Sequence, residues 1–92
     1  MSTHGPSRIL LVDDHDVVRR GMRALLESHP DWEICAEASD GRTAVRLAKE
    51  LAPHLVVMDM TMPELNGVDA ARQISVHSKN TPVLMVSMHE NE

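Results

Sequence analysis

Four short apolar runs, separated by segments with a helical pattern, are the feature of this sequence that most constrains its fold. The runs are residues 8–12, 32–38, 55–58 and 83–86. Three of them are nearly continuous, as in parallel strands buried on both faces, whereas 32–38 alternates apolar and polar residues, as in a strand near a sheet edge. Apolar residues at helical spacing follow the first three runs. Strands that alternate with helices in this way predict right-handed βαβ crossovers and a parallel sheet with helices on both faces.

The first predicted helix begins at Asp16 and ends before His29-Pro30-Asp31. Its apolar stripe consists of Val17, Val18, Met22, Leu25 and Leu26. Three arginines lie elsewhere on this helix and are expected to form a solvated face: Arg19, Arg20 and Arg23. A second helix is predicted from Gly41 to a point before Pro53, and a third begins near Val68.

Composition limits the classes of function that the chain can serve. Ninety-two residues make one domain, and fourteen Asp and Glu against nine Lys and Arg give a net charge of −5. That charge argues against direct binding to nucleic acid, which requires a basic patch. The single Cys35, expected in a partly buried strand, excludes a disulfide framework. No apolar run approaches the ~20 residues that span a bilayer, and the start does not resemble a signal peptide, so we expect a cytoplasmic protein without membrane contact.

Acidic and hydroxyl side chains follow three of the predicted strands. Asp13 and Asp14 end the first, Asp59 ends the third, and Ser87 ends the fourth. In open α/β sheets, sites lie at the carboxyl ends of the strands. Three carboxylates in one pocket repel one another unless a cation neutralises them, and oxygen ligands favour Mg²⁺. Such a site is suited to phosphoryl transfer to a carboxylate.

A simpler interpretation is that Asp13 and Asp14 only begin the first helix, where acids cap exposed N–H groups. Acids at two buried strand ends, with a hydroxyl at a third, favour a functional site over that interpretation. Six histidines, His15 among them, share no ligand spacing and are expected at the surface.

Several segments together resemble a known family. They are Val12-Asp13-Asp14-His15, Met58-Asp59-Met60-Thr61-Met62-Pro63 with Gly67, and Val86-Ser87. In this order they resemble the receiver domain of two-component response regulators. The segments 15–26 and 87–89 are most similar to the NarL/FixJ (LuxR-type) receivers that precede a helix-turn-helix output domain. The resemblance implies a flavodoxin-like (CheY-like) doubly wound parallel sheet with strand order 2-1-3-4-5.

The resemblance also implies residue roles. Asp59 matches the phosphate acceptor, and Mg²⁺ is expected on Asp13, Asp14, Asp59 and the backbone carbonyl of Thr61. Ser87 matches the switch hydroxyl, and the backbone N–H of Met88 matches a donor to the phosphoryl group. The pocket loop corresponds to Met62, Pro63 and Gly67. The implied phosphate donor is a phosphohistidine on a sensor histidine kinase.

The chain differs from the family pattern after its fourth strand. The expected fourth helix, the fifth strand with its lysine and the fifth helix are absent, so the sheet is incomplete (βαβαβαβ), and Lys49 and Lys79 do not match the missing lysine by motif. We therefore expect a tail over residues 1–7 and a truncated receiver over 8–92. DNA contact is expected only through an absent C-terminal output domain. An open strand edge at 83–86 and an uncovered face of the first helix (Val18, Met22 and Leu25) predict a homodimer or domain-swapped oligomer.

Two alternatives stay open on the sequence. A truncated receiver that cannot switch could act only as a dimerisation or interaction module. An aspartyl-phosphate hydrolase of the haloacid-dehalogenase type also uses a strand-end aspartate with Mg²⁺. Such enzymes carry a second aspartate two residues after the nucleophile, and here that residue is Thr61.

Overall fold

Seven secondary-structure elements follow the predicted order. The computed structural model describes residues 5–59 and 67–86. The elements are β1 (Ser7–Val12), α1 (Asp16–Glu27), β2 (Trp32–Ala38), α2 (Gly41–Leu51), β3 (Leu55–Asp59), α3 (Gly67–His77) and β4 (Val83–Val86). Boundaries differ from the prediction by about one residue, since β1 begins at Ser7 and β3 includes Asp59. Among the described helices, none is long and apolar enough to cross a membrane.

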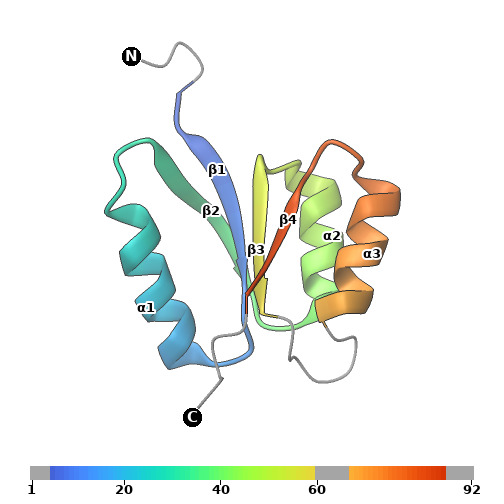
Figure 1. Ribbon diagram of the computed structural model, residues 1–92, viewed down its shortest axis with the longest axis horizontal. Helices are drawn as coiled ribbons and strands as arrows, with labels where there is room; N and C mark the ends of the chain where they lie inside the picture. Colours follow the sequence, from blue (N-terminus) through green and yellow to red (C-terminus); the bar gives the residue numbers. More distant parts are fainter. Residues whose placement is uncertain (1–4, 60–66, 87–92) are drawn as a thin grey trace.

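The four strands form one parallel sheet in the order β2-β1-β3-β4. This is the first part of the predicted 2-1-3-4-5 order, and it places the alternating strand β2 at an edge. The helix α1 lies on one face of the sheet, and α2 and α3 lie side by side on the other (Figure 1). The predicted doubly wound, flavodoxin-like architecture is therefore confirmed, with β1 and β3 at its centre.

The core has two apolar layers, one on each side of the sheet. On the α2 and α3 side, the buried cluster contains Leu10, Val12, Val56 and Met58 from the strands and Ala44, Ala48, Ala70 and Ile74 from the helices. On the α1 side, it contains Ile9, Leu11, Ile34 and Val57, with Met22 and Leu26 packed against it. Full burial of such a Leu or Ile side chain contributes about 1.5–3 kcal/mol, so the central strands supply most of the stabilisation.

An irregularity in β2 changes which face its side chains occupy. Ile9 of β1 pairs with Ile34, but the next residue, Leu10, pairs with Ala36, so Cys35 is an extra residue in the ladder. Ile34 therefore packs in the α1 layer, whereas Ala36 packs in the opposite layer. The sequence predicted strict alternation with Ile34 and Ala36 on one face, which is wrong because a one-residue bulge exchanges the faces. Cys35 is a partly buried free thiol, as predicted.

The apolar stripe of α1 is narrower than the sequence predicted. Val18, Met22 and Leu26 are half-buried, but Val17 is 80% exposed and Leu25 is 73% exposed. Residues four apart on a helix form one face, and it is this face that lies on the sheet. Figure 1 shows α1 without a neighbouring helix beside it in the described part of the chain, so residues on its flanks remain in solvent.

The start of α2 is fixed by a side-chain cap. Asp40 has extended backbone geometry, and its carboxylate accepts a hydrogen bond from the Thr43 N–H at 2.8 Å. That backbone hydrogen bond lowers the pKa of the Asp40 carboxyl below its ordinary value. The helix ends at Leu51, and Ala52 takes a left-handed conformation (φ 45°) just before Pro53.

Candidate functional site: an acidic cluster at the carboxyl ends of β1 and β3

Two buried aspartates lie next to each other at the carboxyl end of the sheet. Val12 of β1 pairs with Met58 of β3. The next residues are Asp13, which directly follows β1, and Asp59, which is the last residue of the adjacent parallel strand β3. Both carboxylates are completely buried. The strand order alone brings them together, as the sequence analysis predicted from the ends of the apolar runs.

Asp14 and His15 complete this cluster. One ligand atom from each of Asp13, Asp14, His15 and Asp59 lies within 4.8 Å of all the others. Asp14 is partly exposed and His15 is more than half exposed. The prediction that His15 is a surface residue is correct, but its place beside the carboxylates was missed because histidine spacing was compared only with other histidines.

Backbone and side-chain hydrogen bonds fix the loop that carries Asp13 to His15. The Asp13 N–H donates to the carbonyl oxygen of Ala38 at 3.1 Å, which extends the β1–β2 ladder past the end of the strand. The His15 N–H donates to Asp13 Oδ1 at 2.7 Å, and His15 Nδ1 lies 2.9 Å from Asp14 Oδ1. The residue at the N-cap of α1 is His15. Asp13 and Asp14 therefore precede the helix instead of capping it.

Arg19 of α1 holds this loop through the backbone carbonyl of Asp13. Its Nη1 donates to the backbone carbonyl of Asp13 at 2.5 Å, its Nε to Glu37 Oε1 at 2.8 Å and its Nη2 to Asp16 Oδ1 at 2.7 Å. The side chain is only 16% exposed. Burial opposes the charged guanidinium, but the hydrogen bonds to Glu37 and Asp16 outweigh it and raise the pKa of Arg19 above its ordinary value.

The expectation that Arg19, Arg20 and Arg23 form a solvated face is wrong for Arg19, whereas Arg20 and Arg23 are exposed, as predicted. Arg23 donates to Glu37 and to Glu27, so Glu37 of β2 accepts from two arginines of α1. The hydrogen bond to Glu37 raises the pKa of Arg23. Glu37 can make these contacts because the bulge at Cys35 turns it toward α1. Both Arg19 and Glu37 were missed as site-supporting residues, and no spacing in the sequence indicates them.

The donor set fits a hard divalent cation. Three carboxylates so close together require positive charge to offset their repulsion, and carboxylate oxygens are the ligands that Mg²⁺ prefers. The neighbouring imidazole adds a ligand type that Mn²⁺ and later transition metals accept more readily than Mg²⁺ does. The cluster therefore supports the predicted metal chemistry at Asp13, Asp14 and Asp59.

Other residues expected at the site lie outside the described part of the chain: Thr61, Met62, Pro63, Ser87 and Met88. Gly67, expected in the pocket loop, is the first residue of α3. Lys49 lies in the last turn of α2 and Lys79 precedes β4, so both are near the opposite end of the sheet from the aspartates. As expected, the structure does not bring either of these lysines to the acidic cluster.

The family model of the response regulator receiver domain matches residues 9–92. The chain belongs to this family. Its receiver domain is 40% identical over 86 residues to the transcriptional regulatory protein YdfI of Bacillus subtilis (strain 168), covering 94% of this chain and 40% of YdfI. It is 42% identical over 80 residues to LiaR of the same organism, covering 87% of this chain and 38% of LiaR. The chain thus spans about two fifths of the length of these curated relatives.

Solved structures agree with this assignment. A LuxR-family two-component response regulator from Aurantimonas sp. SI85-9A1 superposes with a TM-score of 0.87 at 41% identity, covering 95% of this chain and 62% of that one. The similarity to transcriptional regulators of the LuxR type agrees with the resemblance in residues 15–26. Family membership does not favour the hydrolase or the pure interaction module.

Proposed function

We propose that this receiver domain accepts a phosphoryl group on Asp59 from a phosphohistidine of a sensor histidine kinase, and that residues 8–92 carry this activity. The observation that supports it is the buried pair of Asp13 and Asp59 on adjacent strands, with Asp14 completing the acidic cluster. In the transfer, an Asp59 carboxylate oxygen forms a bond to phosphorus while the phosphorus–nitrogen bond of the donor breaks. The electron pair of that bond stays with the imidazole nitrogen.

Asp13 and Asp14 would hold Mg²⁺ together with Asp59 and the carbonyl of Thr61. Bound Mg²⁺ supplies positive charge against the oxygens of the transferred group. The new phosphoryl group adds about −1.5 to −2 charge to an acidic pocket, so transfer should require the metal. The chain's own part is to hold the acceptor oxygen in place, because Asp59 is the last residue of a strand paired on both sides.

We assign the remaining roles by resemblance to the family. Ser87 would turn its hydroxyl toward the phosphoryl group, and the Met88 N–H would donate to one of its oxygens. Met62, Pro63 and Gly67 would shape the floor of the pocket. YdfI and LiaR are transcriptional regulatory proteins, so the phosphorylated domain would control a transcriptional output domain, through which any DNA contact would occur.

Intact-mass spectrometry after incubation with acetyl phosphate and Mg²⁺ tests the acceptor. One phosphoryl group should be added to the wild-type chain and none to Asp59→Asn. Asp31→Asn is the matched control, because Asp31 is exposed at the other end of the sheet. Labelling of Asp59→Asn at the wild-type level would refute the assignment of Asp59.

Removal of the metal gives a second test of the same proposal. Excess EDTA should abolish labelling of the wild-type chain, and added Mg²⁺ should restore it. Asp14→Ala should require a higher Mg²⁺ concentration for half-maximal labelling than the wild type does. Labelling that is independent of Mg²⁺ would refute the metal part of the proposal.

A further inference from the structure

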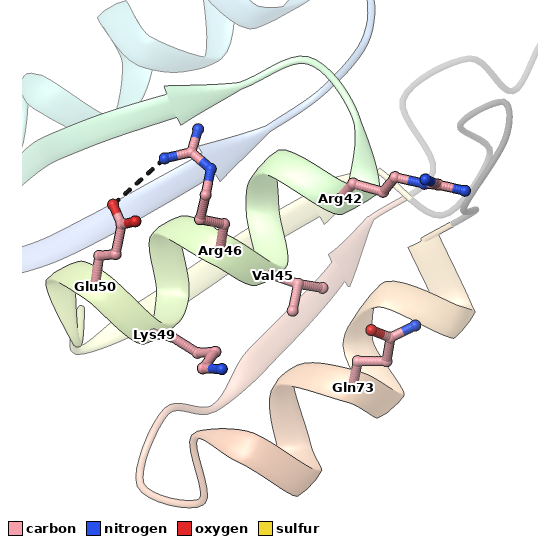
Figure 2. A pocket seen from close by; sticks show the side chains of 6 residues that line it. All are labelled: Arg42, Val45, Arg46, Lys49, Glu50 and Gln73. Carbon is pink, nitrogen blue, oxygen red and sulfur yellow. Dashed lines mark hydrogen bonds and ion pairs between the residues drawn. The ribbon is translucent and has the colours of Figure 1, made fainter.

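The groove between α2 and α3 carries an excess of positive charge on an otherwise acidic chain. It has a volume of about 370 Å³ and is lined by Arg42, Val45, Arg46, Lys49, Glu50 and Gln73. Three of these side chains are cations and one is a carboxylate, whereas the whole chain has a net charge of −5. Figure 2 shows that all except Gln73 come from α2, and that Arg46 is turned toward Glu50.

The three cations form one row along α2. Arg42, Arg46 and Lys49 occupy positions i, i+4 and i+7, which lie on the same face of a helix. With a rise of 1.5 Å per residue, the row is about 10 Å long. A second hollow, of about 380 Å³, continues from Lys49 past the ends of both helices and includes Lys79. The positive surface therefore follows the length of α2.

Little within the described chain neutralises this row. Arg46 is 3.4 Å from Glu50, an exposed i, i+4 pair, and such pairs contribute little. Arg42 is close enough to Asp40 to affect the pKa of its carboxyl, but neither Arg42 nor Lys49 has a carboxylate within 4.0 Å among residues 5–59 and 67–86. By contrast, Arg19 and Arg23 of α1 are both paired with Glu37.

We propose that the α2–α3 groove docks an acidic amphipathic helix of a partner protein. Carboxylates at i, i+4 and i+7 of such a helix would repeat the spacing of Arg42, Arg46 and Lys49. An aliphatic side chain between them would cover the half-buried Val45, and the Gln73 amide can donate to a carboxylate or accept from a polar neighbour. The helices α2 and α3, whose residues line this groove, lie on the face of the sheet opposite α1 (Figure 1). The proposal does not depend on phosphorylation of Asp59.

An acidic helix fits this groove better than nucleic acid does. Binding of single-stranded nucleic acid uses aromatic side chains for base stacking, and none lines the groove. The net negative charge of the chain also repels a long polyanion at distances beyond the groove. A short helix with a few carboxylates encounters mainly the local positive row.

Fluorescence anisotropy with the complete 92-residue chain tests the proposal. The probe is a fluorescein-labelled helical peptide with glutamates at i, i+4 and i+7 around a leucine, and the control peptide has glutamine in place of glutamate. The glutamate peptide should bind saturably at an ionic strength of about 0.01 M and more weakly at about 0.15 M, where the Debye length falls from about 30 Å to about 8 Å. Equal binding of the two peptides would overturn the proposal.

Charge substitutions locate the binding surface. Lys49→Gln should weaken binding about fivefold, and Lys49→Glu about tenfold or more, because an attraction is replaced by a repulsion. Arg20→Glu, which makes the same charge reversal at an exposed position of α1, should change binding by less than about twofold. An equal effect of Arg20→Glu would show general electrostatic attraction and overturn the proposal. If a single-stranded oligonucleotide bound more tightly than the glutamate peptide, and if Lys49→Glu weakened that binding, the groove would be a nucleic-acid site and the proposal would be overturned.

Discussion

The replacement of Arg19 by alanine should destabilise the fold and weaken metal binding at the same time. The guanidinium makes two charged hydrogen bonds, to Glu37 and Asp16, and one to the carbonyl of Asp13. Its partner Asp16 is 72% exposed and Glu37 is partly exposed, so each charged bond contributes about 0.5–1 kcal/mol and the carbonyl bond about 1 kcal/mol. The loss sums to about 2–3 kcal/mol, which for a domain of this size corresponds to a fall in Tm of about 8–24 °C.

The effect on metal affinity separates a positioning role from general stabilisation. Without Arg19, the loop that carries Asp13 and Asp14 loses the bond that ties it to α1, although both carboxylates remain. Loss of a residue that orients metal ligands typically lowers affinity by 10–100-fold, and we expect a loss of about tenfold, at the low end of that range. Calorimetric titration with Mg²⁺, at a temperature where the variant is fully folded, measures it.

Arg23→Ala is the matched control for this prediction. Arg23 donates to the same Glu37 but is 48% exposed, and its hydrogen bonds go to Glu37 and Glu27, not to the Asp13 loop. Its replacement should lower Tm less than Arg19→Ala does and leave Mg²⁺ affinity unchanged. Arg19→Lys keeps the charge but cannot make all three hydrogen bonds of the guanidinium. The Mg²⁺ affinity of this variant should therefore lie between those of the wild type and Arg19→Ala. A normal Mg²⁺ affinity in folded Arg19→Ala would refute the reasoning.

Three further predictions follow from other parts of the structure. Asp40→Ala should cost about 1 kcal/mol in stability. The Thr43 N–H lowers the folded-state pKa of Asp40. The stability difference between the wild type and Asp40→Ala should therefore be complete above the unfolded pKa of about 3.9 and disappear as the pH falls through the lower folded-state pKa. Thermal melts followed by circular dichroism at several pH values measure it. Trp32 begins β2 at the end of the sheet opposite the aspartates, so Mg²⁺ should leave its emission unchanged, and deep quenching would contradict this placement. The 92-residue chain should self-associate in sedimentation experiments through β4, and Leu84→Lys, at a 53% exposed position, should weaken association; a monomer at every concentration would contradict it.

The order of elements and the position of the acidic pair were accessible from the sequence because both depend on burial. A strand such as 55–59 that is covered on both faces must be apolar throughout, so a carboxylate at its end is conspicuous. Once β1 and β3 are neighbours, Asp13 and Asp59 meet without any contribution from side-chain conformation. The same applies to β2, whose alternation correctly predicted an edge strand.

The supporting contacts could not be predicted because they depend on one inserted residue and on side-chain geometry. The bulge at Cys35 has no signature in the alternation of 32–38, yet it decides that Glu37 faces α1. Arg19 then donates to acceptors in α1, in β2 and in the loop after β1. The spacing of residues along the helix does not predict these partners. For the same reason Arg19 was expected in solvent. The roles of residues such as Thr61 and Ser87 stay predictions.

The two sides of the acidic cluster are held by different kinds of interaction. Asp59 lies within β3, between β1 and β4, and is fixed by the backbone ladder. Asp13 and Asp14 lie beyond β1 in a loop, and their position depends on the contacts of Arg19 and on the bond from the Asp13 N–H to Ala38. A backbone ladder tolerates side-chain substitutions, whereas a side-chain clamp does not. Substitutions at Arg19 should therefore act on the metal-holding pair and leave the placement of the acceptor carboxylate unchanged.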